Sequence, residues 1–206
     1  MKEIDKQKRD DKQRVMFLNC SKLVLCNKEL NYIFRQADSE EIKIYNSDRF
    51  LISFIERTNI QFCVLSSILL TDSEEYSIPR FINEFIPDGD RKREIRNTVN
   101  DYEFQKAFKR IRKLRDKCYV HIDKDEPKVR EQIKLVQDER DLITNGLINS
   151  IKLIYAESKA GYLDFFDNHP ADIKSQIRMI NEWRTYNVRD LTERIKSYKR
   201  QSTTKK

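Results

Sequence analysis

Glycine and proline are scarce in this chain, whose 206 residues include three glycines and four prolines. Turns between strands use both residues heavily, so their scarcity argues against a sheet protein with many short connections. The glycines, at positions 89, 146 and 161, are also too widely separated to build a glycine-rich phosphate loop. We therefore expect an all-α fold, an antiparallel bundle of four to five long helices plus one short helix.

Long apolar runs and paired metal ligands are missing too. The most hydrophobic stretch, residues 58–71, is too short to cross a bilayer, and the amino terminus is too charged for a secretory signal. The four cysteines stand singly, without the spacing of a zinc site or a disulfide framework, and two histidines are too few for a histidine-rich metal site. We expect a cytoplasmic protein with no membrane contact, no metal and no cofactor.

Apolar residues recur every three or four positions along most of the chain, which is the period of an amphipathic helix. The pattern predicts one helical domain over residues 1–206, with a carboxy-terminal helical extension over 161–199 and a disordered tail at 200–206. Residues 38–48 interrupt the pattern as a polar patch, with Ser47 or Asp48 as a helix cap, and PDGD at 87–90 is a turn signal. The predicted helices cover about 10–37, 48–71, 79–85, 91–122, 127–154 and a segment from 171 onward.

Each long helix has a predicted inner face. The helix over 48–71 is the most hydrophobic and should lie at the centre of the bundle. In the helix over 91–122, residues 97–100 are candidates for a break near the start. The expected inward residues are Val15, Leu18, Leu25 and Ile33 in the first helix, Leu51, Ile55, Phe62, Leu65 and Leu69 in the second, Phe104, Phe108, Ile111, Leu114, Cys118 and Ile122 in the third, and Val129, Ile133, Val136, Ile143, Leu147, Ile151 and Ile154 in the fourth.

The net charge of +7 is concentrated in one segment. Residues 91–117, here called the basic segment, contain eleven basic and four acidic residues, a difference of seven that equals the excess of the whole chain. A concentrated cationic strip suits a polyanion, because neutralising phosphates releases counterions. The alternative is a solvated helix face that happens to be basic.

The stretch RIRKLRDKCYVHIDKD, residues 110–125, holds the best candidates for chemistry. On a continuous helix His121 falls at the margin of the apolar stripe. Arg115 lies six residues earlier, which is a rotation of about 120° around the helix axis and a shift of roughly 9 Å along it. These two side chains cannot touch within one straight helix, but a second copy of the helix packed across the stripe would bring them into one cleft.

The residue types at these two positions suit RNA. A neutral histidine takes a proton from a ribose 2′-hydroxyl or protonates a leaving oxygen near neutral pH. An arginine forks onto phosphate oxygens and stabilises the charge of the transition state. We expect Arg110, Arg112, Lys113 and Lys117 to hold the RNA backbone nearby. The alternative is a structural His121 bonded inside the bundle and a solvent-facing Arg115; His169 reads as a capping-loop residue.

Arg115-Asp116-Lys117 followed by Val120-His121-Ile122-Asp123 resembles the signature of HEPN domains, an arginine and a polar residue with a histidine after a gap of four to six. Here five residues intervene, and the match is closest to the abortive-infection branch of the family. The order of elements agrees over about 45–157: a hydrophobic helix, a short helix and turn, the signature helix, and another long amphipathic helix.

The resemblance implies a metal-independent endoribonuclease that acts as a homodimer, its two signature helices facing each other across one composite cleft. It also implies a toxin or antiphage effector, of the kind often neutralised by an antitoxin protein. Arg115 would be the phosphate-binding residue, His121 the general acid and base, and Asp116 the polar neighbour that orients them. Val120 departs from the alanine that is frequent at its position, and some family members bind without cleaving.

Three hypotheses follow from the sequence. The first is the ribonuclease. The second is a non-catalytic module that binds RNA through the basic segment alone, and its binding would depend on salt but not on His121. The third is a helical interaction protein whose basic segment docks on an acidic partner protein.

Overall fold

The computed structural model describes residues 3–47, 49–120 and 135–158, together with residues 182, 189, 192 and 193. Every regular element in those ranges is a helix, so the predicted all-α class and helical bundle are confirmed. The helices are α1 (Glu3–Asn31), α2 (Ser39–Ser47), α3 (Arg49–Leu70), α4 (Ile78–Phe85), α5 (Asp90–Asn100), α6 (Tyr102–Leu114) and α8 (Gln137–Ser158), with π-helical turns η1 (Tyr32–Gln36) after α1 and η2 (Arg115–Val120) after α6.

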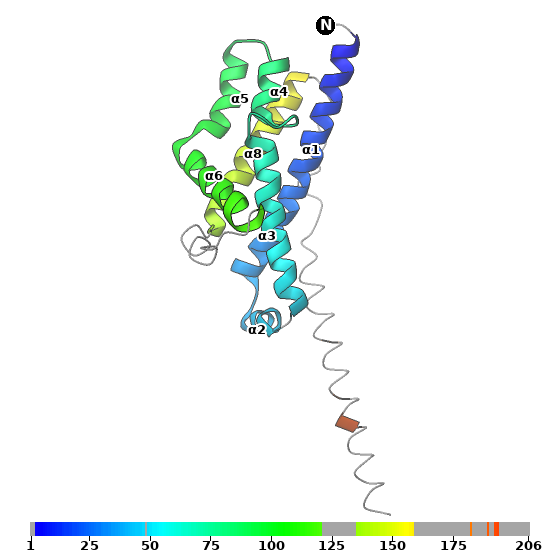
Figure 1. Cartoon of the computed structure of the whole chain (residues 1–206), viewed down its shortest axis with the longest axis vertical. Coiled ribbons are helices and arrows are strands. Elements are labelled where there is room, and N and C mark those ends of the chain that lie inside the picture. Colours follow the sequence, from blue (N-terminus) through cyan, green and yellow to red (C-terminus); the bar gives the residue numbers. More distant parts are fainter. Residues whose placement is uncertain are drawn as a thin grey trace, which may run out of the picture.

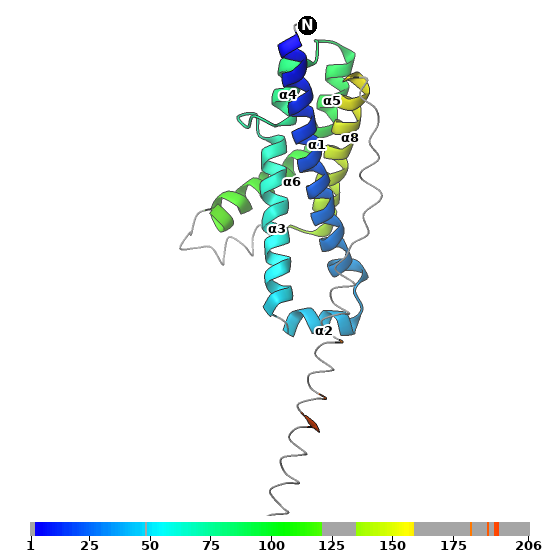
Figure 2. The ribbon, with the colours of Figure 1, turned by 90° about the vertical axis from the view of Figure 1, so that its right-hand side faces the viewer.

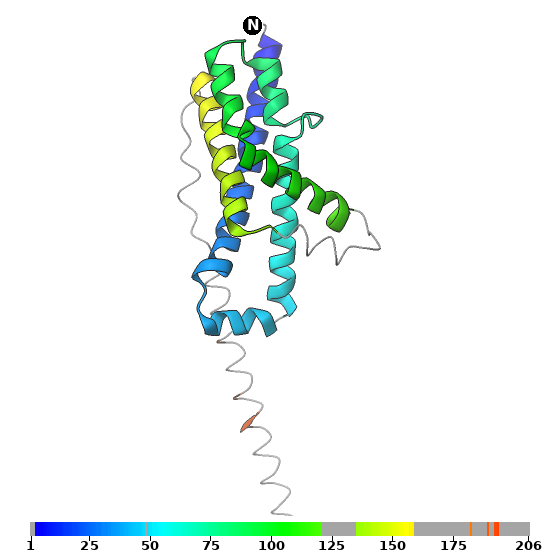
Figure 3. The same cartoon turned by 90° about the vertical axis from the view of Figure 1, so that its left-hand side faces the viewer.

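Three long helices, α1, α3 and α8, form the body of the bundle (Figure 1). Helix α1 packs against both α3 and α8, and α5 packs against α8. The short helix α2 runs across one end of the bundle, beside the start of α3 (Figure 2). Helix α6 leaves the bundle direction, crosses α3 obliquely, and extends its carboxy-terminal end beyond it (Figure 3). This crossing places the end of α6 and the beginning of η2 at the side of the molecule.

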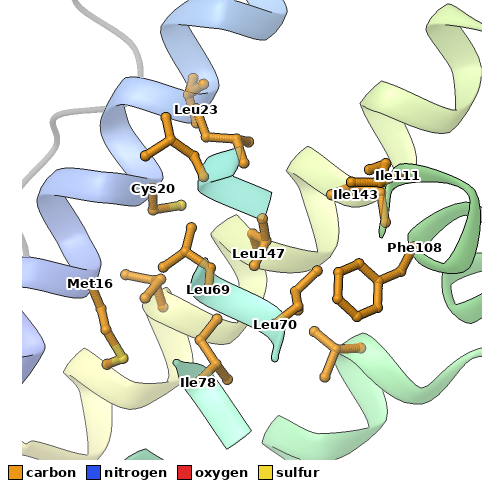
Figure 4. Close-up of a cluster of buried hydrophobic side chains, with 14 of the residues drawn as sticks. Met16, Cys20, Leu23, Leu69, Leu70, Ile78, Phe108, Ile111, Ile143 and Leu147 are labelled. Atoms are coloured by element: carbon orange, nitrogen blue, oxygen red, sulfur yellow. The ribbon is translucent and has the colours of Figure 1, made fainter. Parts of the chain in front are cut away.

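The core lies where α1, α3, α4, α6 and α8 meet (Figure 4). In α6 the predicted inward residues within the described range are all buried, with exposed fractions of 7% or less for Phe104, Phe108, Ile111 and Leu114. Four of the five inward residues predicted in α3 are buried, and Ile55 packs partly buried against the same cluster. In α8 the buried predictions are Ile143, Leu147, Ile151 and Ile154.

The predicted inner face of the first helix is confirmed at Ile33, which lies in η1 and is 3% exposed, but is wrong at Leu18 and Leu25. Leu18 and Leu25 are 45% and 37% exposed, while the face that packs on the core is formed by Met16, Phe17, Cys20, Leu23, Val24 and Leu30. Apolar residues occur at helical spacing on both sides of this helix, so spacing alone does not choose between the two faces. Lys12 and Gln13 are also buried, and the two polar residues hide the true face from a hydrophobicity pattern.

Residues 39–47 of the polar patch form helix α2, so this stretch does not interrupt the helical structure. The Oδ1 atom of Asp38 accepts hydrogen bonds from the backbone N–H groups of Glu40 and Glu41, both at 2.9 Å. The Oε2 atom of Glu41 accepts in return from the backbone N–H of Asp38 at 3.1 Å. This reciprocal capping box nucleates a short helix whose apolar content is too low to signal it. The predicted cap Asp48 lies outside the described residues.

The helix predicted over 91–122 is two helices and a π-helical turn. Asp101 ends α5 and caps α6, its Oδ2 atom accepting from the backbone N–H of Glu103 at 3.0 Å and of Phe104 at 3.3 Å. The break follows directly after the residues 97–100 that the sequence marks as a break candidate. From Arg115 onward the backbone adopts the wider η2 turn.

The expected start at Pro127, with residues 127–134, lies outside the described residues. Leu135 and Val136 are not helical, and α8 starts at Gln137. Val136 is 54% exposed, so its predicted inward position is wrong; it precedes the helix and does not belong to its face. The predicted short helix is confirmed as α4, where the Ser77 side chain accepts from the backbone N–H of Arg80 at 3.3 Å. PDGD is confirmed as the turn that leads into α5.

Candidate functional site

The predicted site residues lie along α6 and η2. Arg110, Arg112 and Lys113 occupy the last turns of α6, and Arg115, Asp116 and Lys117 open η2. His121 lies outside the described residues, so its relation to Arg115 stays a prediction. The straight-helix spacing assumed for that pair does not apply here, because the chain turns more widely from Arg115 onward.

Arg115 is bound to its chain neighbour. Its Nε and Nη2 atoms lie 2.8 Å and 2.7 Å from the Oδ1 atom of Asp116. The Arg115 side chain is 21% exposed and that of Asp116 is 44% exposed. The guanidinium is therefore partly sheltered, held in one orientation, and still open to solvent on one side.

The fold divides the basic segment into a half on α5 and a half on α6 and η2. On α5 its cations are engaged by partners: Arg91 contacts Glu94 at 2.6 Å, Lys92 contacts Asp88 at 2.9 Å and Arg93 contacts Asp90 at 2.7 Å. Arg96 donates to the amide oxygen of Asn83 at 2.6 Å. Carboxylates thus lie beside three of the four cations of the α5 half and lower its net positive charge, whereas Arg96 bonds to a neutral amide.

The carboxy-terminal half of α6 is different. Lys109, Arg112 and Lys113 are exposed, and within the described ranges no carboxylate forms an ion pair with them. Their spacing of three and four residues puts them on neighbouring positions of one helix surface. Cations without local partners keep their full charge for a partner such as phosphate.

Arg110, which the sequence assigns to RNA binding, is ion-paired with Glu139 of α8 and is one-third exposed. The pair joins α6 to α8, so Arg110 reaches a phosphate only after it leaves this carboxylate. Lys109 is an exposed cation outside the predicted RNA-binding set. The signal was present in its position, four residues before Lys113 on the surface opposite Phe104 and Ile111.

Three cysteines are excluded as nucleophiles in the folded chain. Cys20, Cys26 and Cys63 carry buried thiol groups that are not joined in a disulfide. Burial raises the pKa of Cys20 from 9.0 to about 12 and that of Cys26 to about 11, so both thiols are protonated at neutral pH. Among the residues that the structure describes, no group of three or more His, Cys, Asp or Glu side chains is placed to hold a metal ion.

No described helix is both long enough and apolar enough to span a bilayer. No protein-family model, curated protein or solved structure matches the chain. The resemblance to HEPN domains therefore depends on the residues of the signature and on the order of the helices around it.

Proposed function

We propose that this protein is a metal-independent endoribonuclease of the HEPN type, in which Arg115 binds the scissile phosphate and His121 transfers the protons. The observation that carries the proposal is the position of Arg115. It is partly buried, oriented by Asp116, and located at the start of a π-helical turn. This turn follows directly after Arg112 and Lys113, which form no ion pair with a carboxylate of the described residues. Such turns are rare and occur frequently at functional sites.

The proposed reaction is an internal transesterification. The ribose 2′-oxygen attacks the adjacent phosphorus while His121 accepts the 2′-hydroxyl proton, and the 5′-oxygen of the next nucleotide leaves and takes up a proton. The products are a 2′,3′-cyclic phosphate and a 5′-hydroxyl. Arg115 stabilises the negative charge on the phosphate oxygens during the attack. The nucleophile belongs to the RNA itself, so no metal-activated water is needed.

The proposal includes a second copy of the chain. One chain supplies only half of the groups of the proposed site, because its signature helix carries a single Arg115 and a single His121. A homodimer with facing signature helices brings the second set of these groups into one composite cleft. As a toxin or antiphage effector, the protein would also have an antitoxin protein as a partner. Gel filtration tests the dimer: an elution volume of a dimer is expected, and a stable monomer removes the composite cleft.

The deciding experiment incubates the purified protein with a structured RNA in EDTA and compares wild type with His121→Ala. Cleavage by the wild type alone is the expected result. Equal cleavage by both proteins, or none by either, removes the catalytic assignment.

A non-catalytic RNA-binding role is the second candidate. It is favoured by Lys109, Arg112 and Lys113, which are exposed and have no carboxylate partner in the part of the chain that the structure describes; they need no histidine to bind a polyanion. It predicts salt-dependent binding that survives His121→Ala and falls when these three cations are neutralised. Docking on an acidic protein partner is the third, and it predicts no RNA binding at all.

A further inference from the structure

One aromatic side chain stands in water at the beginning of α6. Tyr102 is 76% exposed, although tyrosine usually packs its ring against other apolar groups. It is the first residue of the helix, directly after the cap Asp101, whose carboxylate fixes the backbone at this point. The ring is therefore presented from a held position and not from a loose loop.

The register of α6 places this ring in line with three exposed lysines of the same helix. Tyr102, Lys106, Lys109 and Lys113 follow one another at intervals of four, three and four residues, so they form a single stripe along the helix. This stripe lies opposite the buried face formed by Phe104, Phe108 and Ile111. It is about 16 Å long at the rise of an α-helix, and it ends two positions before Arg115.

We propose that this stripe, Tyr102, Lys106, Lys109 and Lys113, is a track for single-stranded RNA. The Tyr102 ring stacks on an unpaired base, and the three lysines contact the phosphates that lead toward Arg115. The inference deepens the proposed function and rests on it, because it names the form of RNA that the same site takes.

The exposed ring of Tyr102 favours a single strand over other polyanions. Lysines alone bind any polyanion, but an exposed aromatic ring adds affinity only for a partner with a flat base to stack on it. In a duplex the bases are already stacked on each other, and an acidic peptide has none. Lys106 contacts Glu103 at 3.5 Å, and both side chains are more than half exposed, so this weak pair yields to a phosphate.

The binding test uses a fluorescent single-stranded 2′-O-methyl oligonucleotide and a blunt duplex of the same length, titrated against the full chain. The methyl group blocks the proposed nucleophile, so binding is measured without cleavage. Tyr102→Ala is expected to weaken single-strand binding about 5- to 150-fold and to leave duplex binding unchanged. Tyr102→Phe keeps the ring and should bind like wild type. Tyr76→Ala, which removes an exposed tyrosine from the segment between α3 and α4, is the matched control.

The lysines are tested by salt dependence. Replacing Lys106, Lys109 and Lys113 with glutamine should flatten the slope of log affinity against log salt by about 2 for a single strand. An unchanged slope overturns the track. An equal loss of single-strand and duplex binding in Tyr102→Ala, no loss in that variant, or a loss in Tyr102→Phe as large as in Tyr102→Ala overturns the stacking role. Equal competition by polyglutamate overturns the assignment to RNA.

Cleavage of unmodified RNA, measured in parallel, separates the two proposals. Tyr102-dependent binding without cleavage by the wild type supports the track and removes the ribonuclease. Cleavage with binding that is indifferent to Tyr102 removes the track and leaves the ribonuclease standing.

Discussion

The guanidinium of Arg115 is clamped by the carboxylate of Asp116, with Nε and Nη2 both within 2.8 Å of the same oxygen. Two of the five N–H groups of the arginine are used in this contact, which leaves three for another acceptor. Asp116 therefore orients Arg115 without exhausting its donors. This is the arrangement expected of a residue that positions a phosphate-binding arginine.

Arg115→Lys tests the paired hydrogen bonds that the guanidinium can donate, separately from its positive charge. Lysine keeps the positive charge but cannot donate two parallel bonds to a phosphate. We expect RNA cleavage to fall about 100-fold, the size of effect seen when one transition-state donor is lost, while RNA affinity and thermal stability change little. Single-turnover cleavage rates measure this. A lysine variant as active as the wild type would show that paired hydrogen bonds from residue 115 to the phosphate have no role.

Asp101→Ala tests the break between α5 and α6. The variant loses the side-chain acceptor for two backbone N–H groups, and the free energy of unfolding should fall by about 1 kcal/mol. Asp101→Asn keeps an acceptor oxygen and is expected to recover most of the loss. Urea denaturation compares the two, and equal stability of the alanine variant and the wild type would contradict the capping role.

Gly146→Ala tests the contact between α8 and the start of α6. A Cβ atom at this position would lie 2.8 Å from Cδ2 of Phe104, closer still to Cε2 of the same ring, and 3.0 Å from the backbone oxygen of Thr98. Alanine is favoured over glycine in a helix by about 1 kcal/mol, but overpacking costs about 1–3 kcal/mol. We expect a net loss of stability in thermal unfolding.

Asn145→Ala is the control for this substitution, because Asn145 precedes Gly146 in α8 and its side chain is exposed. It should change the unfolding free energy by no more than about 0.5 kcal/mol. A Gly146→Ala variant more stable than wild type would mean that the two helices are not this close.

Glu84→Gln tests an ion pair between α4 and α1. The buried Lys12 ammonium donates to Oε2 of Glu84 at 2.9 Å, and this bond, with smaller help from Arg80, lowers the pKa of Glu84 from 4.5 to about 2. A lowered pKa adds stability that is present above pH 4.5 and is lost as the pH falls from 4.5 toward 2. Glu84→Gln should therefore cost stability at pH 7 and much less at pH 2.

The expected cost at pH 7 is about 1 kcal/mol, because the Glu84 side chain is 27% exposed and solvent screens the pair. Urea denaturation at several pH values measures it, with Glu75→Gln as a control at an exposed carboxylate. A cost that does not change between pH 7 and pH 2 would contradict the pairing.

The helical class and the inner face of α6 could be predicted from the sequence because both depend on local periodicity. Phe104, Phe108, Ile111 and Leu114 repeat at helical spacing on one side only, and all four are buried. In α1 the apolar residues occupy two sides, and the choice of Met16 over Leu18 depends on which helices pack there. Local spacing carries no information about those partners.

The ion pairs of the predicted site residues could not be predicted from the sequence. The sequence counts charges, whereas the fold decides which of them meet: Arg110 is paired with a carboxylate 29 residues away, and Lys109 beside it is left for solvent. The ion pair between Arg115 and Asp116 joins chain neighbours within the π-helical turn η2, and no apolar pattern signals that turn.

The central claim, an RNA 2′-hydroxyl attacking a phosphate bound by Arg115, is tested most directly by the ends of the cleaved strand. Mass spectrometry of a defined single-stranded RNA after incubation with the protein in EDTA should show a 2′,3′-cyclic phosphate and a 5′-hydroxyl, and neither after incubation with Arg115→Ala. A 3′-hydroxyl with a 5′-phosphate, or the same products from Arg115→Ala, would contradict the account.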